Sequence, residues 1–134
     1  MRKIHLLFLP FTLLVGVIFS CSKATVPPDF KFNTGPGYTY TNATNNNTNI
    51  TVGIIAAKGG TRLKSVDILY TDINGVSHTD TTITITDRSQ QDKFTYDCII
   101  TPPTPYATGV ATWTFIVTDQ HGNNATRAIT ITYQ

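Results

Sequence analysis

The sequence contains no glutamate, no cluster of basic residues and only two cysteines among its 134 residues. Nucleic-acid binding requires a clustered basic surface that displaces counterions from the phosphate backbone. The missing cluster therefore excludes that class of function, and it excludes a polybasic membrane patch as well. The chain is instead rich in threonine, isoleucine, valine and tyrosine, whose β-branched and aromatic side chains fit the pleated surface of a strand.

Catalytic motifs are also missing. Ser65, Ser77 and Ser89 lack the Gly-x-Ser-x-Gly elbow, and no ordered Ser/His/Asp triad can be assembled from the sequence. The aspartates fall mostly in turns or on polar strand faces, as solvated residues do. Cys98 is in phase with apolar neighbours, so we expect a buried thiol and not a nucleophile, which would need an adjacent base. We therefore expect no enzymatic activity, no cofactor and no resident metal.

Residues 1–20 are predicted to form a removable signal peptide. Arg2 and Lys3 make a short basic start, and residues 4–19 are mostly apolar. A transmembrane helix needs about 20 apolar residues, so this run is short for a membrane span, whereas its flanks match a secretory leader. Removal of Arg2 and Lys3 leaves equal numbers of basic and acidic residues, and the mature chain is then neutral.

The end of the leader, Ile18-Phe19-Ser20-Cys21, resembles the bacterial lipobox. That motif has an aliphatic residue three positions before the cysteine and a small residue directly before it. Ile18 and Ser20 match, while Phe19 departs from the usual small residue. The resemblance implies lipidation of Cys21, cleavage before it, and acylation of the new amino terminus with fatty acids such as palmitate. Several acyl chains on one residue anchor a protein stably, because each buried CH₂ contributes about 0.8 kcal/mol.

Residues 21–29 are predicted to form a lipidated tether that is polar at first and then stiffened by proline. We expect the protein to be anchored in the outer membrane. Surface-exported lipoproteins of the Bacteroidetes often carry an acidic run after the cysteine, and this chain has none. Both the periplasmic and the cell-surface face of the membrane therefore stay open.

Residues 30–134 are predicted to form one all-β domain. Apolar and polar residues alternate in short segments and no helical period occurs, which predicts seven strands, at residues 38–41, 49–57, 64–71, 81–86, 93–100, 110–118 and 126–133. Turn residues separate the segments, and Asn74-Gly75 is a strong hairpin signal because a type I′ turn needs positive φ at both central positions. About seven short strands, each with one apolar face, predict two sheets packed face to face.

The stretch 113–133, WTFIVTDQHGNNATRAITITY, resembles the last hairpin of bacterial immunoglobulin-like domains. Upstream, Gly37-Tyr38-Thr39, Val52-Gly53-Ile54 and Lys58-Gly59-Gly60 resemble segments of small immunoglobulin-like lipoproteins of the Bacteroidetes. The resemblance covers roughly residues 30–134 and implies an immunoglobulin-like β-sandwich. It implies little about function, because this fold carries many unrelated activities.

Tyrosines near the ends of the predicted domain are the candidate ligand contacts. Tyr38, Tyr40 and Tyr106 lie in loops or near the domain ends, where exposed rings beside polar groups could bind a glycan, whereas Trp113 is predicted to lie in the core. The leading hypothesis is a membrane-anchored, non-catalytic binding or adhesion module for a glycan or a partner protein. The alternative is a structural subunit of a surface assembly such as a fimbria, since an unpaired strand edge can accept a donor strand.

Two further motifs concern modification and metal binding. Asp80-Thr81-Thr82 resembles the site at which Bacteroidetes O-glycosylate exported proteins, which implies glycosylation of Thr81. Residues 72–75 and 119–123 supply carboxylate and amide oxygens of the kind that Ca²⁺ prefers. The same residue types close turns through local hydrogen bonds, and we expect that use here.

Overall fold

The structure is a computed structural model that describes residues 26–45, 48–102 and 108–134. The predicted signal peptide, Cys21 and Tyr106 lie outside the described residues. Eight strands make up the fold: β1 (Asp29–Phe32), β2 (Ala43–Asn45), β3 (Ile50–Ala57), β4 (Leu63–Thr71), β5 (Ser77–Thr84), β6 (Lys93–Ile100), β7 (Gly109–Asp119) and β8 (Asn124–Tyr133). No helix long and apolar enough to cross a membrane occurs in the described part of the chain.

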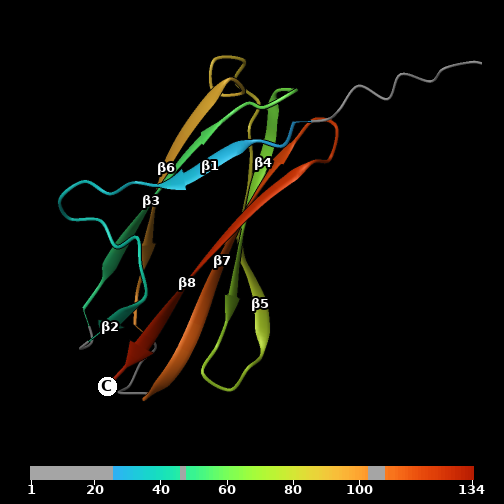
Figure 1. Cartoon of the computed structure of the whole chain (residues 1–134). Coiled ribbons are helices and arrows are strands. Elements are labelled where there is room, and N and C mark those ends of the chain that lie inside the picture. The colour runs from blue at the N-terminus through green and yellow to red at the C-terminus, as the bar shows by residue number, and fades with distance from the viewer. Residues whose placement is uncertain (1–25, 46–47, 103–107) are drawn as a thin grey trace, which may run out of the picture.

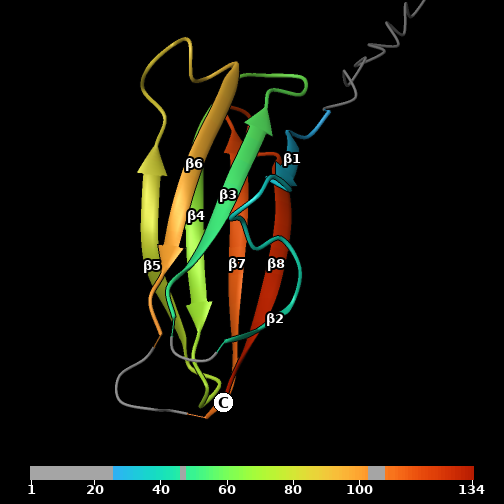
Figure 2. The same ribbon diagram turned by 90° about the vertical axis from the view of Figure 1, so that its left-hand side faces the viewer.

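The strands form a three-stranded sheet of order β1-β3-β6 and a five-stranded sheet of order β2-β8-β7-β4-β5. Figures 1 and 2 show the two sheets packed face to face. The hairpins β4–β5 and β7–β8 stay within one sheet, whereas the chain changes sheets from β3 to β4, from β5 to β6 and from β6 to β7. This is the connectivity of an immunoglobulin-like sandwich, and it confirms the predicted fold class.

The start of the domain contributes to both sheets. β1 pairs antiparallel with β3, and after an irregular segment β2 pairs parallel with β8. Within the predicted tether, the described residues 26–29 already contact the domain, because the Gly60 N–H donates to the Val26 carbonyl at 2.8 Å and β1 begins at Asp29. The chain therefore enters at the end of the sandwich that carries the β3–β4 loop (Figure 1).

Alternating residues from both sheets fill one core. Its fully buried members include Ile54 of β3, Ile68 of β4, Ile100 of β6, Phe115 of β7 and Ile131 of β8. Trp113 is buried as predicted, with 7% of its surface exposed. Burial of apolar area at roughly 25 cal/mol per Å² is the main force that holds the two sheets together.

The predicted strand at 38–41 is wrong. This segment is irregular, and the short strands β1 and β2 lie on either side of it. The Tyr-Thr alternation mimics a strand, yet its backbone contact with β3 is one bond from the Thr39 N–H to the Thr51 carbonyl, at 2.8 Å. β1 and β2 escape the pattern because they are short, and two of the three residues of β2 are polar.

The predicted strand at 81–86 is displaced, because β5 runs from Ser77 to Thr84. Its first four residues are exposed and polar, so they show no apolar alternation that a sequence pattern could detect. The first three of them pair with β4 all the same, because an edge strand needs only backbone partners. The other five predicted strands match β3, β4, β6, β7 and β8, apart from small shifts at their ends.

Candidate binding surface on the three-stranded sheet

Tyr38 packs on the outer face of the three-stranded sheet. The loop after β1 runs along β3, where the Asn33 N–H donates to the Gly53 carbonyl at 2.8 Å. A Cβ atom at Gly53 would lie 2.8 Å from both Cδ1 and Cε1 of Tyr38, which is closer than van der Waals contact allows. Glycine at position 53 therefore makes room for the Tyr38 ring against the backbone of β3.

Asp97 fixes the far end of the Tyr38 side chain. Gly53 of β3 is directly opposite Asp97 of β6, so the ring reaches across β3, and its hydroxyl donates to Asp97 Oδ2 at 3.1 Å. The hydrogen bond to Asp97 and the negative charge of that carboxylate raise the pKa of Tyr38. The phenol therefore stays protonated at neutral pH, and its hydroxyl orients the carboxylate of Asp97 by donating a hydrogen bond to it.

Ile99 extends this surface along β6 toward the end of the strand. Its side chain lies on the same side of the strand as those of Thr95 and Asp97, and it is 65% exposed, the most exposed large apolar side chain in the described part of the chain. We call the surface formed by Tyr38, Thr51, Thr95, Asp97 and Ile99 the outer binding face. It combines an aromatic ring, a carboxylate, two hydroxyls and an apolar side chain, a mixture suited to an amphiphilic ligand.

The predicted contact residues are not all part of this face. Tyr38 belongs to it, whereas Tyr40 lies two residues further along the irregular segment and is 45% exposed. Tyr106 lies outside the described residues. Thr81 is half-buried on β5, opposite Ile68, and its hydroxyl donates to Asp80 Oδ2 at 3.2 Å.

Sequence reasoning missed Gly53, Asp97 and Ile99. The apolar run Cys98-Ile99-Ile100 held a usable signal, because three consecutive apolar residues place one of them on the outward face of a half-buried strand. The pairing of Gly53 with Asp97 had no such signal, because it depends on the register between β3 and β6.

The aspartates considered for calcium close turns instead. Asp119, fully buried, accepts the backbone N–H groups of His121 and Asn123 at 2.9 Å each and the Asn123 amide at 2.8 Å. Burial alone would raise its pKa, but these hydrogen bonds outweigh it and the pKa is lowered. Asp72 accepts the N–H groups of Asn74 and Val76 in the same way. Within the described residues no group of three or more potential ligands is placed to hold a metal ion.

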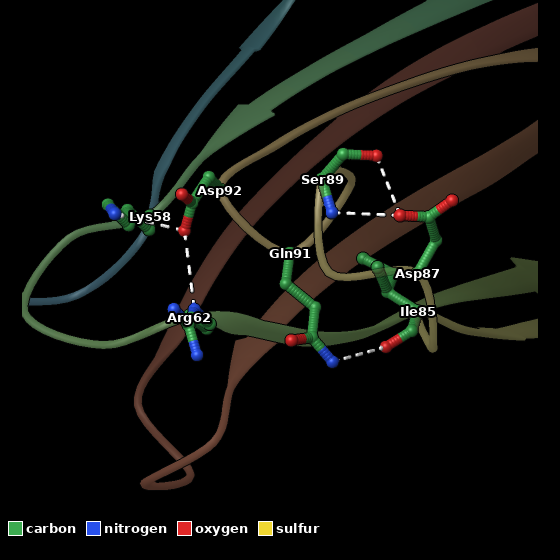
Figure 3. Close-up of polar contacts among 7 residues, drawn as sticks. All are labelled: Lys58, Arg62, Ile85, Asp87, Ser89, Gln91 and Asp92. Atoms are coloured by element: carbon green, nitrogen blue, oxygen red, sulfur yellow. Dashed lines mark hydrogen bonds and ion pairs between the residues drawn. The ribbon is translucent and has the colours of Figure 1, made fainter.

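A second polar cluster ties together two loops at the end where the chain enters (Figure 3). Lys58 Nζ and Arg62 Nε lie 2.9 Å and 3.5 Å from the same oxygen of Asp92, and the hydrogen bond from Lys58 is the largest cause of the lowered pKa of Asp92. In the neighbouring turn the Ser89 hydroxyl donates to Asp87 at 2.6 Å. A serine that donates to a carboxylate lacks the histidine base of a triad. We therefore assign this cluster a structural role in holding the loops.

Cys98 lies on the inner face of β6 and is 4% exposed. Burial, and secondly the charge of Asp80, raises the pKa of its thiol to about 11. A thiol of that pKa is almost entirely protonated at neutral pH and is a poor nucleophile. The position and the pKa of Cys98 agree with the prediction of a buried structural thiol.

Together the fold and the outer binding face define an immunoglobulin-like β-sandwich with an exposed, chemically mixed surface on its smaller sheet. A comparison of the sequence with models of known protein families and with curated proteins finds no match. The function is therefore argued from the surface itself.

Proposed function

We propose that this protein is a membrane-anchored lipoprotein whose sandwich domain is a non-catalytic binding module and whose ligand contacts the outer binding face. The observation that carries the proposal is the Tyr38 ring, seated on Gly53 and tied to Asp97. A ring held from two sides loses little conformational entropy when a ligand binds, which favours affinity.

A glycan is the ligand class that best fits this chemistry. The C–H face of a sugar can pack on the exposed part of the Tyr38 ring, and sugar hydroxyls can donate to Asp97. The second oxygen of Asp97 accepts no hydrogen bond from the part of the chain that the structure describes. Thr51, which is opposite Ile99, and Thr95, two residues before Asp97 on β6, add hydroxyl groups.

A glycan array probed with the full-length protein and with Tyr38→Ala tests this function. We expect selective binding by the wild type and a loss of about tenfold or more in the variant, because stacking and orientation of Asp97 are lost together. Tyr40→Ala is the matched control, since Tyr40 is exposed outside this face. Absence of glycan binding by the wild type would remove the glycan assignment, and equal loss in both variants would contradict the outer binding face as its site.

The membrane anchor in this proposal depends on lipidation of Cys21, which needs its own test. Metabolic labelling with a fatty acid should mark the wild type and leave Cys21→Ala unlabelled. Label that persists in the variant would contradict lipidation at this residue. Fractionation and protease accessibility of intact cells would then distinguish the periplasmic from the cell-surface face of the outer membrane.

Glycosylation of Thr81 stays a prediction that a mass measurement can decide. The intact mass of the protein purified from its native host should exceed that of the lipidated polypeptide, and Thr81→Ala should remove the excess. A native mass equal to the lipidated polypeptide alone would exclude the modification.

The alternative function, a structural subunit of a surface assembly such as a fimbria, is favoured by a different observation. Among the described residues, β6 ends its sheet as a long strand with no pairing partner on its outer side. Such an edge can accept a strand from another chain.

A further inference from the structure

Four strands end the two sheets, namely β1 and β6 in the smaller sheet and β2 and β5 in the larger one. An edge strand presents unpaired N–H and C=O groups to any extended chain that approaches. Proteins blunt such edges with short strands, bulges, charges or covering side chains.

Three of the four edges are blunted in these ways. β2 has three residues, and β1 has four, with the Phe30 carbonyl already accepting Arg127 Nε at 2.6 Å. β5 is longer, but its register against β4 shifts after Ile68, which leaves Asp80 as a bulge, and its sequence, SHTDTTIT, is almost entirely polar.

In the described part of the chain β6 is neither short nor bulged, and its charged residues are Lys93 and Asp97. Its eight residues, KFTYDCII, contain no proline or glycine and pair with β3 in one unbroken register. Aromatic and β-branched residues of this kind have high strand propensity. The exposed Ile99 lies on the outward face of this strand, two residues beyond the charged Asp97.

The larger sheet extends past β6, as Figure 2 shows, because β5 continues it beyond β4. A strand added to β6 would therefore have the inner face of β5 beside it, including the half-buried Thr81 and Ile83. The same overhang opposes edge-to-edge pairing of two whole domains, since their β5 strands would meet between them. We therefore expect the added partner to be a single extended segment and not a second domain.

We propose that β6 binds an extended peptide segment of a partner chain by antiparallel strand addition. Cross-strand pairs determine the chemistry of that segment. It carries lysine or arginine opposite Asp97 and an aliphatic residue opposite Ile99 on its outer side, and small apolar residues on the side that faces β5. This proposal rests on the alternative function, in which β6 accepts a strand, and it specifies the chemistry of the partner segment. Binding of the segment uses the backbone of β6, which a glycan bound at Tyr38 does not need.

Fluorescence anisotropy of a synthetic peptide with full-length protein in detergent tests the proposal. In the probe peptide every second residue is a valine whose side chain faces β5. The residues between these valines face outward and are valine, lysine and threonine, placed opposite Ile99, Asp97 and Thr95. We expect saturable binding, and we expect loss of binding when the amides that face β6 are N-methylated, because only strand pairing requires those donors. Replacement of the peptide lysine by glutamate should weaken binding about tenfold.

Two protein variants complete the experiment. Ile99→Lys should weaken peptide binding at least about tenfold, whereas Val110→Lys, at a 52% exposed valine of the other sheet, should leave it unchanged. No binding of the parent peptide, equal binding of the N-methylated peptide, or an unchanged affinity of Ile99→Lys would overturn the proposal. A dimer in sedimentation that Ile99→Lys dissolves would overturn the single-segment assignment. Because Tyr38→Ala spares the β6 backbone, failure of glycan binding and failure of peptide binding are separate outcomes.

Discussion

The two long sides of this sandwich are built differently. On the side of β1 and β8 the sheets are locked by aromatic contacts, with Phe32 edge-to-face against both Phe30 and Phe115 at centroid distances of 5.5 Å. On the side of β5 and β6 the inner residues Ile83 and Tyr96 are only partly buried against the core. We call these the closed side and the open side.

The difference separates stability from recognition. The closed side buries large rings and uses Arg127 to bridge β8 to β1, so its residues contribute mainly to the free energy of unfolding. The open side leaves the β6 backbone and Ile99 accessible, so changes there should alter binding more than folding. Measurements on matched variants of the two sides can test this division.

The largest effect is expected for Phe115→Ala on the closed side. Phe115 is fully buried and packs against Phe32, so its truncation leaves a cavity and should cost about 3–5 kcal/mol in urea unfolding. Tyr96→Ala removes an aromatic ring from the open side, where it is half-buried, and should cost clearly less. Equal losses of stability in the two variants would contradict the expected difference between the closed side and the open side.

The hairpin that ends in β8 should depend on its aspartate more than the hairpin that ends in β5. Asp119→Ala leaves the part-buried amides of the turn after β7 without their acceptor and should cost about 2 kcal/mol. Asp72→Ala should cost less, because the contacts it removes are exposed to solvent. Thermal unfolding of both variants beside the wild type measures the difference.

Acid should remove the Asp119 contribution. Its pKa is lower in the folded state than in the unfolded chain, so its stabilisation is complete above the unfolded pKa and is lost as pH falls through the folded value. The gap in stability between wild type and Asp119→Ala should therefore narrow at acidic pH. A gap independent of pH would mean that this carboxylate does not titrate differently on folding.

A smaller effect is expected for Arg127→Ala. Its guanidinium donates to the Phe30 carbonyl and lies 5.9 Å from the centre of the Phe30 ring, so the loss should be about 1 kcal/mol. Hydrogen exchange should rise in β1 and stay unchanged in β6. Faster exchange in β6 would show that the closed and open sides are coupled.

The smallest effect concerns Cys98 on the open side. With a thiol pKa of about 11 and 4% exposure, the native protein should react with iodoacetamide at pH 8 only very slowly, and should react fully in denaturant. Ile99→Lys is the control, since it changes the edge without changing the inner face. Rapid labelling of the native chain would show that β6 opens more readily than its burial indicates.

Alternation in the sequence predicts β3, β4, β6, β7 and β8 because each buries one face and exposes the other. It fails at residues 38–41, where the Tyr-Thr pattern reflects a ring that covers Gly53. It also fails at the start of β5, where an edge strand needs no apolar face. The candidate surface was only partly predictable, because Tyr38 is exposed by its loop whereas Asp97 reaches it through strand register.

The sequence by itself determined the two-layer all-β class, the buried state of Trp113 and Cys98, and the turn chemistry of Asp72 and Asp119. These depend on local periodicity and on hydrogen bonds between residues a few positions apart. Only the tertiary structure decided which strands end the described sheets, that β6 is the long strand with an unbroken register among those ends, and that Tyr38 meets Asp97. Those features join residues far apart in the chain, and no local pattern encodes the register that brings them together.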